Sequence, residues 1–265
     1  MFFILLRRNI KISIITPSLN SEKYIRDCID SVISQTYKNI EYIVVDGNSS
    51  DNTQSIVKTY GKKIATFISE NDNGIFDAMN KGIKNATGDI IAILNSDDYY
   101  YDNKVIENIV SEFKNNDISG LYGDLIIISE DKKRIIRNWR SKKLNKKDWE
   151  KGLHPAHPTF FVKKEVYEKF GIFDEKYRIA ADYELMLRFL YIKKIKSKYF
   201  KNKAPLVVMR AGGNSNKDIK AIIKSNKEVI ESWKDNNLNP PKFLVVGKLY
   251  SKIKQFFFFP KKKLW

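Results

Sequence analysis

The sequence has 265 residues, of which 43% are hydrophobic, enough for one large domain or for a domain with an appendage. The net charge of +17 indicates an anionic partner, either nucleic acid, an anionic membrane surface or a phosphorylated ligand. The single cysteine, Cys28, excludes an internal disulfide framework and fits a reducing compartment. No stretch reaches the roughly 20 apolar residues that span a bilayer, and the arginines near the start follow the apolar residues 2–6, so we expect a cytoplasmic protein.

The first half alternates predicted strands and helices joined by short loops. Strands are predicted at residues 12–16, 42–45, 64–68 and 90–94, which are rich in apolar residues. The helices between them have apolar residues at helical spacing, as in the stripe that contains Ile25, Cys28 and Val32. This alternation is typical of a parallel α/β sheet of the nucleotide-binding, Rossmann-like type. Neither a G-x-x-x-x-G-K-[ST] loop nor a G-x-G-x-x-G turn is present, which argues against P-loop and dinucleotide sites.

Oxygen-bearing side chains come directly after two of these strands. Asp46 follows the second strand, and Asn95, Asp97 and Asp98 follow the fourth. Ligands of open α/β sheets bind at the carboxyl ends of the strands, so these side chains are expected to face one crevice. Adjacent carboxylates there suit a hard divalent cation, Mn²⁺ or Mg²⁺. The alternative is a polar turn in which Asp98 caps a following helix.

The second half is less regular. A helix is predicted at residues 103–114 and a strand at 121–128, followed by a basic segment, 130–151, that we expect to be a mobile, solvent-facing connection. A loop enters a strand that ends at residue 162, helices follow near 166–170 and from about 180, and a loop covers 210–215. The remainder is predicted to be helical, with a boundary at Pro240 and Pro241.

The end of the chain, residues 242–265, combines seven lysines with aromatic residues and contains no acidic residue. Such a composition predicts a segment that lies at an anionic membrane interface. The alternative is a disordered tail that only increases solubility.

Six short motifs follow one another along residues 10–215. They are Thr16-Pro17-Ser18-Leu19-Asn20, Val45-Asp46-Gly47-Asn48-Ser49-Ser50-Asp51, Asn73-Gly74-Ile75-Phe76-Asp77-Ala78-Met79-Asn80-Lys81-Gly82, Leu94-Asn95-Ser96-Asp97-Asp98, Gly171-Ile172-Phe173-Asp174-Glu175 and Ala181-Asp182-Tyr183-Glu184-Leu185. In this order they resemble the family 2 glycosyltransferases, which are inverting enzymes of the GT-A fold. The resemblance implies a GT-A domain at residues 10–215, with residues 216–265 as a basic C-terminal extension.

The resemblance also implies roles for particular residues. Asp46 would hydrogen-bond the nucleotide base, although Gly47 replaces the second acid of that motif. Asp97 would hold a divalent metal on the diphosphate together with Asn95, which stands where the family has an acid. Asp98 would support the metal site or touch the donor sugar, and Asp182 would be the general base. For Asp182 the competing interpretation is a helix cap.

The remaining candidates for substrate binding come from the same motifs and from two loops. They are Thr16, Pro17, Asn20, Asp77, Asn80, Lys81, His157 and Arg210. His157 would lie near the diphosphate, whereas His154 is expected to be structural. Arg210 would reach the leaving group or the acceptor, with an exposed arginine as the alternative.

The function implied is transfer of a sugar from a nucleotide-sugar to a glycan or lipid-linked acceptor in bacterial surface-polysaccharide assembly, at the inner face of the cell membrane. Asp46 favours a UDP-sugar over a CMP-sugar, because uracil offers an N–H that cytosine lacks, with GDP-sugars as the main rival. Two alternatives remain. A sugar-phosphate nucleotidyltransferase would need a glycine-rich first loop, which is absent after Thr16. A nucleic-acid-binding protein would explain the charge, but the sequence contains no such motif, so no nucleic acid is expected as a partner.

Overall fold

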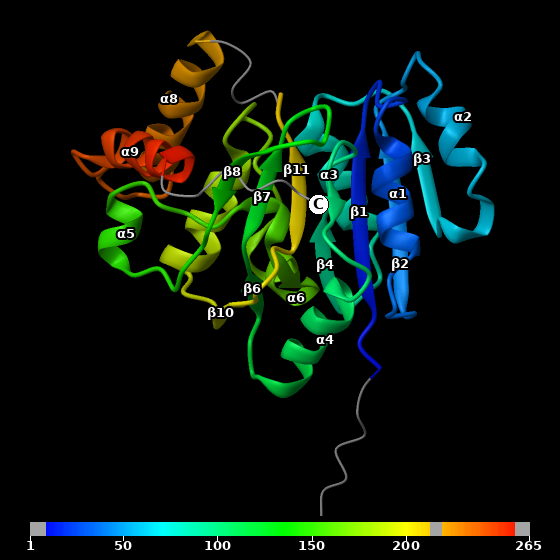
Figure 1. Ribbon diagram of the computed structural model, residues 1–265. Coiled ribbons are helices and arrows are strands. Elements are labelled where there is room, and N and C mark those ends of the chain that lie inside the picture. Colours follow the sequence, from blue (N-terminus) through cyan, green and yellow to red (C-terminus); the bar gives the residue numbers. More distant parts are fainter. Residues whose placement is uncertain (1–8, 213–218, 258–265) are drawn as a thin grey trace, which may run out of the picture.

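The computed structural model describes residues 9–212 and 219–257 and contains two β-sheets (Figure 1). The larger sheet has seven strands in the order β10-β6-β9-β4-β1-β2-β3. Within the described chain, β9 alone runs antiparallel to its neighbours in this sheet. The strands are β1 (Ile12–Ser18), β2 (Ile40–Asp46), β3 (Thr66–Ser69), β4 (Ile90–Ile93), β6 (Gly120–Tyr122), β9 (Phe161–Lys163) and β10 (Ser197–Tyr199). The predicted mostly parallel α/β sheet is thereby confirmed.

The register of the central strands places their carboxyl ends at one edge. Ile12 of β1 pairs with Ile40 of β2 on one side and with Ile90 of β4 on the other. The carboxyl ends of β1, β2 and β4 therefore lie at the same edge of the sheet, with β1 and β2 extending three residues beyond the end of β4. The strand order reverses direction at β1, which is where ligands of open α/β sheets bind.

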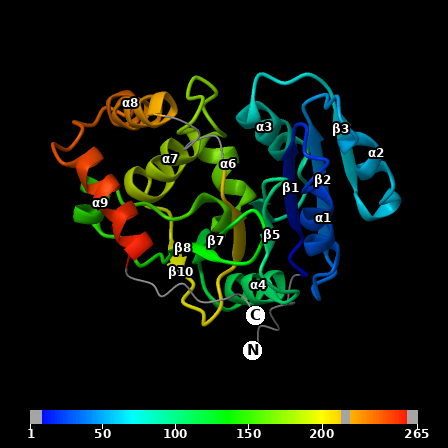
Figure 2. The ribbon, with the colours of Figure 1, turned by 45° about the horizontal axis from the view of Figure 1, so that its top comes forward.

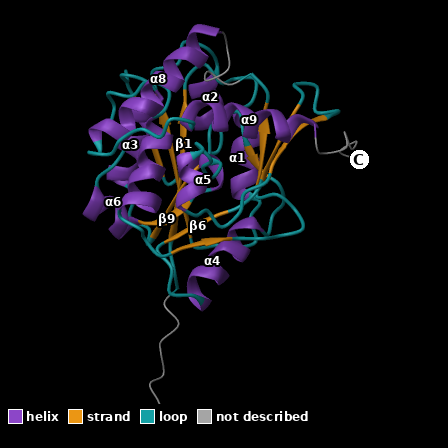
Figure 3. Cartoon of the chain, turned by 90° about the vertical axis from the view of Figure 1, so that its left-hand side faces the viewer, coloured by secondary structure: helices purple, strands orange, loops and turns teal. Residues whose placement is uncertain are grey.

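Helices cover both faces of this sheet, and Figure 3 shows α3 and α6 on the opposite side of β1 from α1. Consecutive residues of β1 belong to different cores: Ile14 lies in the core that includes α1, α2 and α4, and Ile15 in the core that includes α3, α6 and α7. The helices of the first core are α1 (Ile25–Ile33), α2 (Thr53–Lys58) and α4 (Val105–Asn115). Those of the second are α3 (Ile75–Asn85), α6 (Lys164–Phe170) and α7 (Ala181–Met186), which continues as the π-helix η3 (Leu187–Ile192).

The smaller sheet corrects the prediction of one strand at residues 121–128. This stretch forms two strands, β6 in the large sheet and β7 (Leu125–Ile128) in the small sheet, whose order is β5-β11-β7-β8. The chain changes sheet at Gly123, where a Cβ atom would lie 2.5 Å from Leu206 Cδ1. The other strands are β5 (Tyr99–Tyr100), β8 (Ile135–Trp139) and β11 (Val207–Arg210).

The prediction that residues 130–151 form a mobile, solvent-facing connection is wrong. They contain β8 and helix α5 (Lys146–Glu150), which begins with a capping box formed by Asn145 and Asp148. Trp149 of α5 is only 3% exposed and packs edge-on against Tyr183 of α7. The burial of this tryptophan anchors a segment whose basic composition suggested a loop.

The C-terminal part is helical, as predicted, with α8 (Ile219–Asp235) and α9 (Leu244–Phe257) on either side of Pro240 and Pro241. Both helices lie on the α7 side of the molecule, away from β1 and β2 (Figure 2). The short 3₁₀ helices η1 (Gly61–Lys63) and η2 (His157–Thr159) complete the elements. The last part of the predicted membrane segment, residues 258–265, lies outside the described residues, and in the described chain no helix is both long and apolar enough to span a bilayer.

Candidate active site

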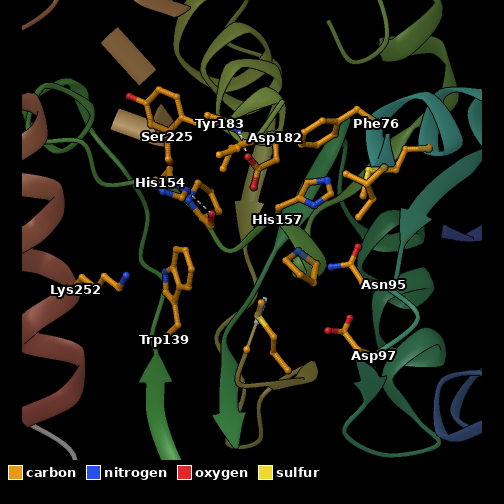
Figure 4. Close-up of a pocket in the computed structure, with 18 of the residues that line it drawn as sticks. Phe76, Asn95, Asp97, Trp139, His154, His157, Asp182, Tyr183, Ser225 and Lys252 are labelled. Atoms are coloured by element: carbon orange, nitrogen blue, oxygen red, sulfur yellow. Dashed lines mark hydrogen bonds between the residues drawn. The ribbon is translucent and has the colours of Figure 1, made fainter. Parts of the chain in front are cut away.

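A cavity of about 1100 Å³ lies where the large sheet meets the C-terminal helices. One end is lined by the carboxyl ends of β1 and β4, including residues 17–21 and 95–97, and by the first turn of α3. The other end is lined by β8, by the loop at 152–158, by α7 and by α9. In Figure 4, Asn95 and Asp97 lie on one side, Trp139 and Lys252 on the other, and Asp182 and His157 between them. Of the predicted residues, Pro17, Asn20, Asn95, Asp97, His157 and Asp182 line this cavity.

The turn after β4 contains one buried oxygen atom that lacks a hydrogen-bond partner. Asn95 Nδ2 donates a hydrogen bond to Asp98 Oδ2 at 3.2 Å, while Asn95 Oδ1 is buried without a hydrogen-bond partner. Burial raises the pKa of the neighbouring Asp97 carboxyl. Burial and the Asp97 charge together raise the pKa of Asp98 well above its usual range. A cation beside these groups would lower the free energy of their ionised form.

These residues fit a divalent cation held jointly by protein and substrate. Asn95 and Asp97 both line the cavity, and amide and carboxylate oxygens are hard ligands of the kind that Mn²⁺ and Mg²⁺ accept. Over residues 9–212 and 219–257, no group of three His, Cys, Asp or Glu side chains could hold a metal by itself. The remaining ligands would therefore come from substrate phosphate oxygens and water, which is usual for Mg²⁺.

Asp98 lies behind this turn and does not line the cavity. It is fully buried, and the chain after it continues into β5 rather than into a helix, so the interpretation of Asp98 as a helix cap is wrong. Arg210 of β11 lies beside it, 2% exposed, with its side chain bound to the backbone oxygen of Asp97 and to Asp27. The guanidinium also stacks over Tyr24 and Tyr99 at 4.8 and 5.0 Å. The alternative of an exposed arginine is therefore wrong, and Arg210 holds the turn from behind.

Asp46 and Thr16 are also enclosed, at the ends of β2 and β1. The oxygens of Asp46 accept hydrogen bonds from the hydroxyls of Ser18 and Ser69 at 3.2 and 3.0 Å and from Ser49 N at 2.9 Å. These bonds join the last residues of β1, β2 and β3. Thr16 is buried with its hydroxyl 3.1 Å from that of Tyr42. Recognition of the base by Asp46 stays a prediction.

Three predicted residues of α3 have structural partners and do not line the cavity. Asp77 accepts a hydrogen bond from Asn73 N at 2.9 Å at the start of the helix, and Lys81 pairs with Glu70 at 2.9 Å. Asn80 is buried, and its side chain donates to Phe173 O and accepts from Phe173 N, both at 3.0 Å. The residues of this helix that line the cavity are Ile75, Phe76, Ala78 and Met79.

Asp182 lies in the first turn of α7 and faces the centre of the cavity (Figure 4). Its Oδ1 accepts a hydrogen bond from Tyr183 N at 2.7 Å. The backbone N–H groups that lead into α7, those of Ile179 and Ala180, instead bind Glu228 of α8, each at 2.8 Å. Glu228 thus fixes the backbone that leads into α7, while Asp182 binds one N–H group of its first turn.

Two histidines border Asp182, and both are enclosed by aromatic rings. His154 packs edge-on against Trp139 and Tyr183, with ring centroids 5.3 and 5.2 Å away, and His157 packs against Phe173. Burial, helped by Lys248, lowers the pKa of His154 to about 4, and burial also lowers the pKa of His157. His154 Nδ1 lies 2.9 Å from Pro155 O and must donate to it, which leaves Nε2 as an acceptor. His154 is therefore neutral near pH 7.

The residues that line the far end, Arg137, Trp139, Lys248 and Lys252, are not among the site residues predicted from the sequence. Lys248 and Lys252 are four residues apart in a helix, so they share one side of it. This four-residue spacing of the lysines, and the position of Trp139 within a basic segment, are the sequence features that could have indicated these lining residues.

A family model and the relatives found by sequence comparison agree on one family. A family model described as Glycosyl transferase family 2 matches residues 13–171. An uncharacterized glycosyltransferase of Rickettsia typhi is 35% identical over 192 residues, which cover 69% of this chain and 60% of the relative. A PGL/p-HBAD biosynthesis glycosyltransferase of Mycobacterium tuberculosis is 28% identical over 180 residues, covering 66% of this chain and 68% of the relative. The chain thus spans about 60% of the length of the Rickettsia typhi relative.

Solved structures agree with the sheet topology. Staphylococcus aureus TarS, residues 1–349, has a TM-score of 0.64 at 19% identity and covers 91% of this chain and 71% of its own. A mannosyltransferase from Pyrobaculum calidifontis, in complex with GDP-Man and Mn²⁺, has a TM-score of 0.63 at 16% identity, covering 91% and 70%. A complex of TarS with UDP-GlcNAc has a TM-score of 0.60 at 21% identity, covering 77% and 59%. These likenesses show the GT-A fold.

Proposed function

The chain belongs to glycosyl transferase family 2, and from that membership we propose that it moves a sugar from a nucleoside diphosphate to an acceptor hydroxyl, with inversion. The observation that carries the proposal is the shared cavity of Asn95, Asp97 and Asp182 (Figure 4). An oxygen-rich turn lies at the sheet end, and a separate carboxylate faces it from another part of the chain. Family membership disfavours the nucleotidyltransferase alternative.

In the proposed reaction, Asp182 and the turn that contains Asn95 and Asp97 have different tasks. Asp182 takes the proton of the acceptor hydroxyl as that oxygen attacks the anomeric carbon. The nucleoside diphosphate leaves from the opposite face of the sugar, which inverts the anomeric centre. Asn95 and Asp97 would hold the divalent cation, which would supply positive charge to the departing diphosphate. Arg210 and Asp98 keep the turn in place from behind.

We propose a UDP-sugar as the donor, and surface-polysaccharide assembly as the setting. UDP-GlcNAc in one TarS complex supports the donor, and GDP-Man in the Pyrobaculum enzyme keeps GDP-sugars as the rival. The name of the Mycobacterium relative refers to PGL/p-HBAD biosynthesis.

The test is a thermal melting screen with UDP-, GDP- and CMP-sugars, each with and without Mn²⁺. A UDP-sugar should raise the melting temperature, and more so with Mn²⁺, because a ligand that binds only the folded chain stabilises it. If a GDP-sugar raises the melting temperature more than a UDP-sugar does, the donor is a GDP-sugar. If no nucleotide-sugar changes the melting temperature, the proposed transfer is wrong.

We also propose that α9 docks the enzyme on an anionic membrane beside its acceptor. The residues Phe243, Val246, Tyr250 and Ile253 are spaced at three and four positions and form an exposed apolar stripe, in which Val246 is 62%, Tyr250 58% and Ile253 55% exposed. Lysines flank the stripe, and each basic residue near anionic lipid contributes about 1 kcal/mol. An apolar face with basic flanks is typical of helices that lie in a membrane interface.

Sedimentation with vesicles tests this docking. Replacing Val246, Tyr250 and Ile253 together by serine should reduce the fraction bound to phosphatidylglycerol vesicles about tenfold, because the apolar stripe is lost. None of the three lines the cavity, so UDP binding serves as the control for folding. Tyr101→Ser, which removes an exposed aromatic side chain outside α9, should bind vesicles normally. Equal sedimentation of the triple variant and the wild type would contradict the proposal.

A further inference from the structure

Helix α9 has a second face, which closes the far end of the cavity. Lys248 and Lys252 project from this face into the cavity, while Val246, Tyr250 and Ile253 do not line it. Figure 4 shows Lys252 extending from α9 toward Trp139. Helix α9 therefore provides cationic groups inside the cavity and apolar groups outside it.

This wall is built into the fold. At Gly247 a Cβ atom would lie 2.4 Å from Lys151 O, and at Gly152, which has a φ of +69°, it would lie 2.5 Å from Leu244 O. The two glycines let α9 and the turn after α5 approach backbone to backbone. Arg137 Nε of β8 donates to Gln255 Oε1 of α9 at 2.7 Å, and Leu244 is buried in the core.

Three cationic side chains, those of Arg137, Lys248 and Lys252, line the far end of the cavity together. Burial lowers the pKa of Lys248 against the opposing charge of Asp182, and Lys252 adds to the lowering. Burial, reinforced by Arg137, lowers the pKa of Lys252. Lys248 Nζ lies 3.4 Å from both Ser225 Oγ and Asn226 Oδ1, and it forms no ion pair with a carboxylate of the described chain. Among the described residues that line this end, Asp182 is the only acid. Holding like charges together in a partly buried site is unfavourable unless an anion joins them.

The position of these cations identifies the substrate that they face. The donor phosphates belong at Asn95 and Asp97, on the opposite side of the cavity (Figure 4). Asp182 lies between, and a base must contact the acceptor hydroxyl. A group bound at Lys248 and Lys252 is therefore on the acceptor side of Asp182.

We propose that Lys248 and Lys252 bind a phosphate group of the acceptor, so that the acceptor is a phosphorylated polyol or glycan, or a sugar on a lipid diphosphate. Both sources offer the same chemistry, a phosphate a short distance from the hydroxyl that is glycosylated. Lysines act as point charges toward phosphate, and Arg137 adds its charge from β8. The inference rests on the proposed function, because it assumes that Asp182 faces the acceptor.

The experiment is calorimetry on the full chain saturated with UDP and Mn²⁺, so that the donor phosphate site is filled. The probes are glycerol 3-phosphate for a polyol phosphate, farnesyl diphosphate for a lipid diphosphate, and galacturonate for an anion without phosphate. Wild type should bind one phosphate probe more tightly than galacturonate, and the tighter probe identifies the source. The double variant K248Q/K252Q should bind that probe at least tenfold more weakly. Lys242→Gln, an exposed lysine outside the cavity, should bind it within twofold of wild type.

UDP affinity is measured first for each protein and separates the outcomes. Unchanged UDP affinity in K248Q/K252Q shows that the variant is folded and that its loss is confined to the far end. The inference is overturned if UDP-saturated wild type binds neither phosphate probe, if galacturonate binds equally well, or if the double variant binds like wild type. Absence of UDP binding by wild type would overturn the proposed function as well.

Discussion

Asp182→Asn is expected to lower the rate of sugar transfer by about 10²-fold or more while UDP affinity stays within about twofold of wild type. Asparagine keeps the size of the side chain and can still accept the hydrogen bond from Tyr183 N, but it cannot take up the acceptor proton. Glu228 still binds the backbone of Ile179 and Ala180, which leads into α7, so the helix should not shift. The measurements are the transfer rate and UDP affinity by calorimetry.

Two nearby acids, Asp174 and Glu184, provide a control variant and an alternative candidate for the base. Asp174→Asn removes an acid that pairs with Lys176 at 3.2 Å and does not line the cavity, so its transfer rate should be normal. Glu184 is the other acid of the Asp182 motif, but it is buried and pairs with Arg188 at 2.9 Å. Normal turnover of Asp182→Asn would therefore show that the base lies outside α7.

Asp97→Asn is expected to fail at the binding step. UDP affinity in the presence of Mn²⁺ should fall by about 10²-fold, and the dependence of UDP affinity on Mn²⁺ should largely disappear, because a metal-ligating carboxylate is lost. The turn itself should persist, since Arg210 binds the backbone oxygen of Asp97 and not its carboxylate. The measurement is calorimetry with UDP, with Mn²⁺ and with a chelator.

The melting temperature provides the control for Asp97→Asn. Burial raises the pKa of Asp97, so its ionised form is unfavourable in the folded chain, and a neutral amide should leave the metal-free protein at least as stable. Asp117→Asn, at an exposed acid paired with Lys196, should bind UDP like wild type. Should Asp97→Asn keep both its UDP affinity and its Mn²⁺ dependence, the cation is held elsewhere.

The sequence was most informative where local pattern and tertiary environment agree. Strand β4 is apolar because both of its faces are buried, and the polar turn after it must then lie at the sheet edge. The sequence could not reveal that residues 120–128 divide between two sheets. Their partners, β9 and β11, follow tens of residues later, and the division depends on close packing at Gly123.

The prediction of site residues from the sequence was limited for a different reason. A motif position does not say whether a side chain faces the ligand or holds the fold around it, as Asn80 illustrates by joining α3 to Phe173. Conversely, the lysines of α9 resemble surface residues in the sequence. They line a cavity only because the last helix returns to β8, a contact between residues more than 100 positions apart.

The close approach of Gly247 and Gly152 has a use outside this molecule. The hydrophobic pattern of a sequence cannot reveal where a helix like α9 docks. Whether glycine stands at the two positions that permit the backbone contact can, however, be checked in the sequence of any relative. Relatives with glycine at both equivalent positions are those in which the same helix should close the acceptor end. Those with larger side chains at both positions must build that end differently, and their acceptors are expected to differ accordingly. With the acceptor bound as proposed, we expect the residues at these two positions to distinguish relatives that glycosylate different kinds of acceptor.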